Sequence, residues 1–265
     1  MNKIEDKFKE LKKKGRKGFI PFITCGDPDL VTSKSLVFAL EEAGADIIEL
    51  GIPFSDPIAD GPTIQASSKR ALTNRVSLRK VIQFAKEIRK KSQIPLVLLS
   101  YFNPIYRLGI KNFIKESKDI VDGVIIPDLP PEEAKLLEGL EEDKLPLIFL
   151  LAPTSTEERI RLVSQFSQGF IYVVSISGVT GAREAVPYKI KNLILQIRNL
   201  TDKPVCLGFG ISTPNQVKVV KDWVDGVIVG SALVNIIDKY AKDKKLMIKE
   251  AGKFVKNLRE ALSSP

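Results

Sequence analysis

Two carboxylates close together in the sequence, Glu49 and Asp60, are the residues best suited to do chemistry. Glu49 lies in the short apolar run 46–50, where the alternation of a strand puts it on the same face as Ile47. Asp60 lies in the following loop, 51–62, whose backbone is restricted by three prolines and two glycines. Burial among apolar neighbours should raise the pKa of Glu49 toward that of a general acid or base. An internal salt bridge for Glu49 and a turn-forming role for Asp60 are the structural alternatives.

The composition excludes most other catalytic arrangements. The 265 residues contain no histidine and only two cysteines, Cys25 and Cys206. Ser-His and Cys-His catalytic groups are therefore excluded, as are zinc sites built from histidine and cysteine. Both cysteines lie in apolar stretches, so we expect them to be reduced and to lie in or near the core.

Three glycine-containing segments in the second half of the chain suggest a phosphate site. They cover residues 177–181, 208–212 and 230–232, and each follows an apolar run. Barrel enzymes often bind phosphate with the loops after strands seven and eight and with a helix N-terminus. Each glycine alone could serve only to turn the chain. Together they indicate an anion site made of backbone N–H groups, and hence a small phosphorylated substrate.

These candidate residues are positioned by apolar runs that we predict to be strands. The runs are nearly continuously hydrophobic, as strands buried on both faces are. They cover Phe19–Thr24, Asp46–Leu50, Pro95–Leu99, Gly123–Pro127, Pro146–Leu151, Phe170–Val174, Pro204–Gly208 and Gly226–Val229.

Helical patterns alternate with these runs, after a first amphipathic segment with Ile4, Phe8 and Leu11 on one side. The alternation predicts a parallel sheet in an α/β protein. Eight units in this length predict one (β/α)₈ TIM-barrel domain over residues 1–265, with an extra N-terminal helix. A doubly wound open sheet is the alternative, but its Gly-x-Gly-x-x-Gly turn does not follow the first run.

Several helix starts can be predicted from N-cap residues. The signals are Asp27-Pro28, for a helix that ends at Gly44, then Ser77, Ser155 with Glu158, and Thr213 with Gln216. The last two pairs have the spacing of a capping box.

The net charge of +9 arises partly from basic runs at 12–14, 89–91 and 242–245. Acidic residues alternate with the basic ones, as in 3–14, which favours solvated helix faces and a general attraction for anionic substrates over nucleic-acid binding. No run approaches the roughly 18 apolar residues of a transmembrane helix. The N-terminus has no apolar signal segment, so we expect a cytoplasmic protein.

These motifs together resemble those of the tryptophan synthase alpha chain family. The stretch Ile48–Pro62 closely matches the signature of that family. Further matches are Pro21–Pro28, Tyr101–Pro104, Pro127–Pro130, Ser177–Gly181, Gly208–Ser212 and Gly230–Ala232. The resemblance implies retro-aldol cleavage of indole-3-glycerol phosphate to indole and glyceraldehyde 3-phosphate.

The resemblance also implies roles for individual residues. Glu49 would protonate the indole ring and take the proton of the glycerol hydroxyl, and Asp60 would accept a hydrogen bond from the indole N–H. Phe22, Leu99 and Tyr172 would enclose the indole and glycerol portions, and Thr180 would lie in a lid that contacts Asp60. The positions that match phosphate-binding residues are Gly181, Phe209, Gly210, Gly230 and Ser231.

The resemblance implies a partner as well. Alpha chains of this family dock on a beta chain, usually as an α₂β₂ tetramer, and pyridoxal phosphate belongs to the beta chain. Asp56, Asn103-Pro104 and Pro130 resemble the docking surface, and no metal or cofactor is implied for this chain. Departures from the family pattern at Cys25, Phe102 and Ile176 do not involve the two carboxylates. A stand-alone lyase and a non-catalytic barrel that regulates its partner remain the alternatives.

Overall fold

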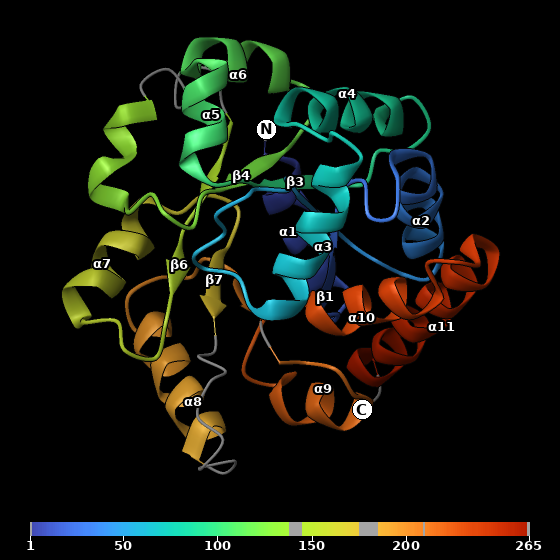
Figure 1. The fold of residues 1–265 in the computed structure, drawn as a ribbon. Helices are drawn as coiled ribbons and strands as arrows, with labels where there is room; N and C mark the ends of the chain where they lie inside the picture. Colours follow the sequence, from blue (N-terminus) through green and yellow to red (C-terminus); the bar gives the residue numbers. More distant parts are fainter. Residues whose placement is uncertain (1, 138–144, 175–184, 209, 264–265) are drawn as a thin grey trace.

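The computed structural model describes residues 2–137, 145–174, 185–208 and 210–263. A ring of strands stands at the centre, with helices around it (Figure 1). The strands follow the order β5-β4-β3-β2-β1-β9-β8-β7-β6, and every neighbouring pair is parallel. This nearly closed barrel confirms the predicted α/β barrel and excludes the doubly wound sheet.

The strands of the described residues correspond to the predicted apolar runs. They are β1 (Gly18–Thr24), β2 (Ile48–Gly51), β3 (Leu96–Leu99), β4 (Gly123–Ile125), β5 (Leu147–Ile148), β6 (Leu150–Leu151), β7 (Ile171–Val174), β8 (Val205–Gly208) and β9 (Gly226–Val229).

The helices of the described residues cover the outside of this sheet and one of its ends. They are α1 (Lys3–Lys13), α2 (Leu30–Glu42), α3 (Pro62–Thr73), α4 (Leu78–Arg89), α5 (Phe102–Leu108), α6 (Ile110–Ser117), the 3₁₀ helix η1 (Pro131–Leu137), α7 (Glu157–Phe166), α8 (Ala185–Arg198), α9 (Pro214–Val220), α10 (Ser231–Tyr240) and α11 (Lys244–Ser263). None of these helices combines the length and the hydropathy that crossing a bilayer requires.

The fifth apolar run differs from its prediction as a single strand. It divides at Phe149 into β5, which pairs with β4, and β6, which pairs with β7. The N–H of Phe149 donates to the hydroxyl of Ser167 at 3.1 Å. The carbonyl of Phe149 accepts from the N–H of Tyr172 at 3.1 Å. Because the two halves form opposite ends of the strand order, the bend in this run brings the ends of the sheet together.

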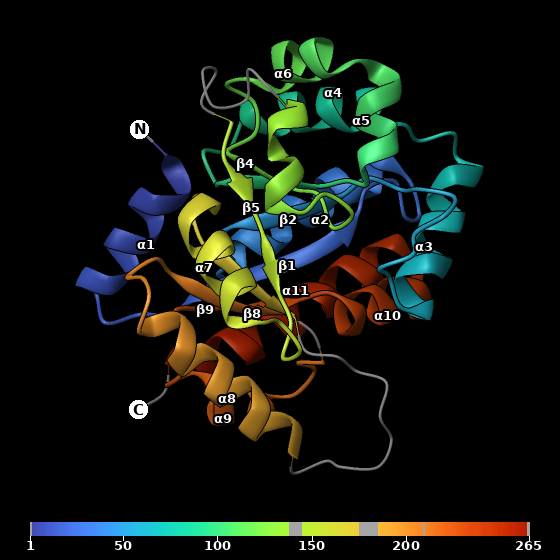
Figure 2. The same ribbon diagram turned by 90° about the vertical axis from the view of Figure 1, so that its left-hand side faces the viewer.

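The interior of the barrel is filled by alternate strand residues and by one side of α1. The interior set is Ile20, Ile47, Val97, Ile125, Ile148, Phe170, Cys206 and Ile228. Ile4, Phe8 and Leu11 of α1 join it, and the rings of Phe8 and Phe170 meet edge to face at 5.9 Å. The predicted N-terminal helix therefore covers one end of the barrel, while α3 and α10 lie toward the other end (Figure 2). Cys25 and Cys206 are both buried and free, as predicted.

An aspartate just before a strand recurs three times at the end of the barrel that α1 covers. Each carboxylate accepts a hydrogen bond from the N–H of the first or second residue of a neighbouring strand and forms an ion pair with an arginine. The three sets are Asp46 with Phe19 and Arg259, Asp122 with Leu96 and Arg89, and Asp225 with Val205 and Arg198. Because a charge out of water needs a partner, each set ties two strands and a helix together.

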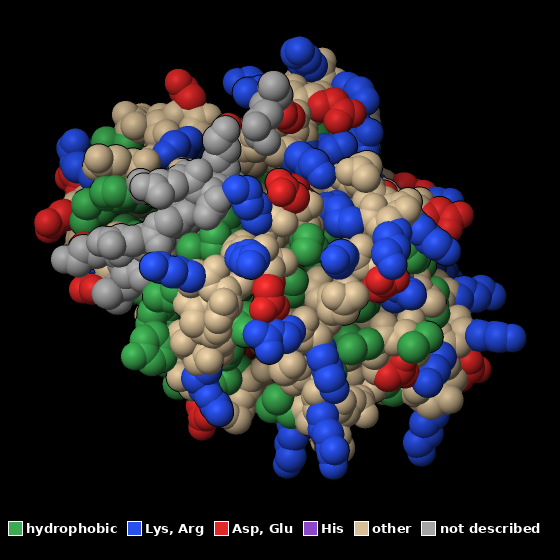
Figure 3. Space-filling view, turned by 90° about the horizontal axis from the view of Figure 1, so that it is seen from above, with side chains coloured by type: hydrophobic (Ala, Val, Ile, Leu, Met, Phe, Trp, Pro, Cys, Tyr) green, Lys and Arg blue, Asp and Glu red, His purple; other side chains and the backbone are tan. Residues whose placement is uncertain are grey.

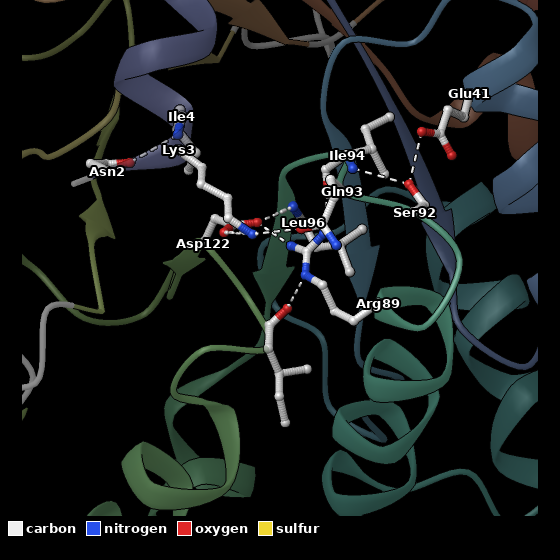
Figure 4. Close-up of polar contacts among 11 residues, drawn as sticks. Asn2, Lys3, Ile4, Glu41, Arg89, Ser92, Gln93, Ile94, Leu96 and Asp122 are labelled. Atoms are coloured by element: carbon white, nitrogen blue, oxygen red, sulfur yellow. Dashed lines mark hydrogen bonds and ion pairs between the residues drawn. The ribbon is translucent and has the colours of Figure 1, made fainter.

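The set at Asp122 is drawn in Figure 4. Arg89 of α4 pairs with Asp122 and also donates to the carbonyls of Ile120 and Ile94. Lys3 of α1 lies 3.8 Å from the other oxygen of Asp122. A single carboxylate thus links α4, the start of β3 and the N-terminal helix.

Two of the predicted helix starts are correct. Ser77 is the N-cap of α4, although its side chain makes no capping hydrogen bond. Thr213 caps α9 and forms the predicted capping box with Gln216.

The prediction that Asp27 caps α2 is wrong. The N-cap is Asp29, whose carboxylate accepts from the N–H of Thr32 at 2.8 Å. Asp27 is buried and binds Arg70 of α3 instead. A partner 43 positions away lies beyond what a local capping pattern can show.

The capping box predicted for Ser155 is also wrong, by one residue. Thr156 is the N-cap of α7 and accepts from the N–H of Arg159 at 3.3 Å. The hydroxyl of Ser155 accepts from the N–H of Ala152 at 3.0 Å, so it stabilises the preceding turn.

Replacing Arg89 by Met should lower the free energy of unfolding by about 3 kcal/mol, because it leaves the buried carboxylate of Asp122 with only the more distant Lys3 as a cationic partner. The matched control is Arg79→Met, which removes the arginine of an exposed pair with Glu116 and should cost under about 1 kcal/mol. Urea unfolding at pH 7 measures both. Equal losses in the two variants would show that the aspartate sets do not hold the barrel end together.

Candidate active site

A cavity of about 520 Å³ opens at the carboxyl ends of the strands. Many of the predicted site residues line it: Phe22, Glu49, Asp60, Leu99, Tyr172, Gly210, Gly230 and Ser231. Thr180, Gly181 and Phe209 lie outside the described residues. The structure thus brings together residues from both halves of the chain, and side chains that no motif had indicated, such as Ile64, Asn235 and Phe254, complete the lining.

A larger hollow, of about 810 Å³, lies at the opposite end of the barrel, between α1 and residues 198–204. Two of its carboxylates already have partners, because Glu5 accepts from the N–H of Gly169 and Asp225 pairs with Arg198. None of the predicted site residues lines it. We therefore place the candidate site in the smaller cavity.

Glu49 lies on β2, in register with Phe22 of β1 and Val97 of β3. Its side chain is 1% exposed, and neither carboxyl oxygen has a hydrogen-bond partner among the described residues. Burial raises the pKa of Glu49 to about 8, and the negative charge of Asp60 adds to the effect. The raised pKa confirms the prediction for this group. Glu49 forms no salt bridge with any described residue, so the structural alternative does not apply there.

Asp60 is held by its neighbours in the proline-rich loop and by Tyr101. Burial raises the pKa of Asp60 to about 6, and a hydrogen bond from the Tyr101 hydroxyl opposes that rise. The same hydroxyl accepts from the N–H of Ala59 at 2.9 Å, and the ring of Phe54 stacks on Tyr101 at 5.2 Å. Asp60 therefore lies at the cavity beside the hydroxyl of Tyr101.

Tyr101 is a site residue to which the sequence analysis assigned no role. In the sequence it is marked only as the first residue of the stretch Tyr101–Pro104, which matches the family. Its position just after the β3 run could have indicated a role at the carboxyl end of the barrel. A buried tyrosine there needs a hydrogen-bond partner for its hydroxyl.

The two carboxyl groups have pKa values that are pushed apart. At pH 7 a group with a pKa of about 8 is mostly protonated, and one with a pKa of about 6 is mostly ionised. One cavity therefore contains a carboxyl group that burial shifts strongly toward its protonated form, Glu49, beside one that is shifted less, Asp60. Such a separation distinguishes acid from base in many enzymes.

Two glycines make room for the aromatic walls of the cavity. A Cβ atom on Gly51 would lie 2.5 Å from the ring of Phe22, and one on Gly208 would collide with the ring of Tyr172. Each ring therefore packs against the backbone of a neighbouring strand. Together with Leu99, the rings form an apolar surface beside Glu49.

The other side of the cavity carries the start of α10. Gly230 is the N-cap, and no side chain caps this helix, so N–H groups of its first turn remain available. Ser231 and Asn235 of the helix line the cavity, as does Gly210, whose φ of +79° suits glycine. A helix N-terminus favours a bound anion.

Positive charge is dispersed on the one face that Figure 3 draws. On the face shown in Figure 3, Lys and Arg side chains lie among Asp, Glu and hydrophobic ones. Several basic side chains pair with a carboxylate three or four positions earlier, as Lys14 does with Glu10, Lys90 with Glu87, and Arg161 with Glu157. These pairs agree with the prediction of solvated helix faces.

A family model described as "Tryptophan synthase alpha chain" matches residues 8–263. The chain belongs to the tryptophan synthase alpha chain family. The alpha chain of Thermoanaerobacter sp. (strain X514) is 53% identical over 264 residues, which cover 99% of this chain and 100% of the relative. The alpha chain of Geobacter sulfurreducens is 45% identical, and the match covers 100% of both chains. The resemblance seen in the sequence is thereby confirmed.

Solved structures agree with this assignment. The alpha subunit of tryptophan synthase from Legionella pneumophila str. Paris superposes with a TM-score of 0.91 at 35% identity, over 99% of this chain and 98% of that one. A chain of the tryptophan synthase complex from Pyrococcus furiosus gives a TM-score of 0.83 at 39% identity, over 92% and 98%. The barrel is therefore shared with alpha chains from distant organisms.

The raised pKa of Glu49 predicts a pH-dependent cost of folding. Between pH 4.5 and about 8 the unfolded chain loses the proton of Glu49 while the folded chain keeps it, so the wild type loses stability as pH rises. Glu49→Gln removes the titrating carboxyl group and therefore this pH-dependent loss of stability. Its stability relative to the wild type should therefore rise from pH 5 to pH 8, by up to roughly 1.4 kcal/mol per pH unit.

Urea unfolding at pH 5 and pH 8 measures this difference. Glu42→Gln, at an exposed position of α2, is the control for removing one carboxyl group. A constant difference between wild type and Glu49→Gln would mean that Glu49 is ionised in the folded protein at neutral pH.

Proposed function

We propose that this chain cleaves indole-3-glycerol phosphate to indole and glyceraldehyde 3-phosphate by a retro-aldol reaction. The observation that carries the proposal is the pair of carboxyl groups in one cavity, of which Glu49 has the more strongly raised pKa. Membership of the tryptophan synthase alpha chain family supports it.

In the proposed reaction Glu49 first donates its proton to the ring carbon that carries the glycerol chain. Positive charge then develops on the ring, and the carboxylate of Asp60 stabilises it by accepting a hydrogen bond from the indole N–H. The bond between the ring carbon and the glycerol chain breaks, and its electron pair restores the aromatic ring. Glu49, now a carboxylate, takes the proton of the adjacent hydroxyl as that carbon becomes the aldehyde.

The cavity has suitable walls for both parts of this substrate. Phe22, Leu99 and Tyr172 provide an apolar surface for the indole, next to Glu49. On the other side, backbone N–H groups near Gly210, Gly230 and Ser231 would bind the phosphate. Phosphate contacts from Gly181 and Phe209, and a lid that includes Thr180, are further parts of the proposal.

The proposed reaction needs no metal or bound cofactor, because the protonated indole ring accepts the electron pair. Pyridoxal phosphate would belong to a beta chain. The composition and the family favour a cytoplasmic location.

We also propose that the chain docks on a tryptophan synthase beta chain, as an α₂β₂ tetramer, and passes its indole to that partner for condensation with serine. The Pyrococcus furiosus relative is described as part of a tryptophan synthase complex. In this chain Asp56, Asn103 and Pro130 are exposed, and Ile58 of the same loop as Asp56 is 84% exposed. A large apolar side chain at the surface of a rigid loop suits burial against a partner.

Replacing either carboxylate should remove most of the activity, and the pH profile should identify their roles. Glu49→Gln should reduce kcat at least 100-fold, because it removes the proton donor, and Asp60→Asn should reduce it by a similar factor. Wild-type kcat/KM should be bell-shaped, rising near pH 6 as Asp60 ionises and falling near pH 8 as Glu49 ionises. Release of glyceraldehyde 3-phosphate measures these rates.

Asp56→Asn is the matched control, because Asp56 lies in the same loop but does not line the cavity. Without a beta chain it should retain wild-type turnover. Turnover that persists in Glu49→Gln would exclude the proposed mechanism.

Addition of a beta chain should raise turnover by the wild type, and Ile58→Glu should reduce that activation while leaving the basal rate unchanged. A charge at this position would be buried without a partner in the complex. Steady-state turnover at increasing beta-chain concentration measures the effect. Equal turnover with and without a beta chain would favour a stand-alone lyase, and no turnover in either case would leave a non-catalytic barrel.

A further inference from the structure

Arg70 joins three elements that surround the cavity. It lies on α3, and its Nε and Nη2 atoms are 2.8 and 2.7 Å from the two carboxylate oxygens of Asp27, in the loop between β1 and α2. Its Nη1 atom is 2.9 Å from Oδ1 of Asp238, on α10. Each nitrogen of the guanidinium group therefore has a carboxylate partner.

The Asp27 end of this arrangement is rigid. Asp27 is 1% exposed, and its Oδ2 atom also accepts from the hydroxyl of Ser67 at 2.5 Å. Asn74, just after α3, donates to the carbonyls of Gly26 and Pro28. The helix and the loop are thus fixed to each other on both sides of the arginine.

The Asp238 end is different, because the side chain of Asp238 is 60% exposed. Arg70 therefore reaches from an anchored carboxylate to one on the surface of a separate helix. A planar guanidinium group can hold two carboxylates at set positions, which the flexible ammonium group of lysine cannot do.

The two helices that Arg70 connects both contribute residues to the lining of the candidate site. At the start of α3, Ile64 lines the cavity and the side chain of Gln65 donates to the carbonyl of Asp60 at 2.8 Å. At the start of α10, Ser231 and Asn235 line the cavity. The helices are in contact and lie near each other in both ribbon views (Figures 1 and 2).

We propose that Arg70 is a positioning residue that sets the distance between the wall carrying Asp60 and the phosphate-binding start of α10. Its ion pair with Asp238 then contributes to phosphate affinity, although neither residue lines the cavity. The inference rests on the proposed function, since it assigns the start of α10 to the phosphate of the substrate.

Asp238→Asn removes only the ion pair between Arg70 and Asp238. It keeps the size of the side chain and leaves the buried Arg70–Asp27 pair intact. A partly exposed ion pair contributes a factor of about two to five to an equilibrium. The dissociation constant of glycerol 3-phosphate, a stable analogue of the proposed product, should therefore rise about two- to fivefold. Calorimetric titration measures it.

A double-mutant cycle tests whether the two residues act together. Arg70→Lys should weaken binding of glycerol 3-phosphate. Adding Asp238→Asn to it should cause little further loss of affinity, because the ion pair between positions 70 and 238 is already lost. The matched control is Glu116→Gln, which removes the carboxylate of another arginine fork, with Arg79 on α4, away from the cavity. Its dissociation constant should equal that of the wild type.

Kinetics separate positioning from a general loss of structure. In Asp238→Asn, KM for indole-3-glycerol phosphate should rise with kcat unchanged, while turnover of the dephosphorylated indole glycerol should not change. Equal losses on both substrates, additive losses in the cycle, or an unchanged dissociation constant would each overturn the inference. A wild type that binds glycerol 3-phosphate without cleaving indole-3-glycerol phosphate would refute the proposed reaction, and the binding cycle would still decide the role of Arg70.

Discussion

A carboxyl group buried without a hydrogen-bond partner is the constraint on which this site depends. An ionised Glu49 in this apolar barrel would be costly, so the proton stays on the group up to a pH of about 8. Burial thereby converts a common side chain into an acid that is available at neutral pH. The two strands beside β2 hold Glu49 in this buried position, in register with Phe22 and Val97.

Buried carboxyl groups have different roles at the two ends of the barrel. At the end covered by α1, every aspartate of the three recurring sets has an arginine and a strand N–H as partners, so charge there stabilises the strand positions. At the other end, Glu49 has no such partner among the described residues. Polar groups that are satisfied hold the structure, whereas the unpaired carboxyl group of Glu49 lines the cavity and is available for chemistry.

Asp60 shows how a second carboxyl group, close to the first, takes a different state. It lies on a loop, and the hydroxyl of Tyr101 hydrogen-bonds to it, so its pKa is raised to only about 6. The difference between a strand and a loop position thus separates the acid from the acceptor. The loop in turn leads directly into α3, which Arg70 joins to the β1–α2 loop and to α10.

The sequence by itself determined the barrel, the identity of both carboxylates and the face on which Glu49 lies. These follow from local rules, because continuous apolar runs, their period of two and the prolines of one loop are readable without a partner. Tertiary structure alone decided where Asp27 binds, which strand bends at Phe149, and which hydroxyl holds Asp60. Each of these depends on a residue distant in the chain, and the energy of such a contact is fixed only when folding brings the two groups together and removes them from water.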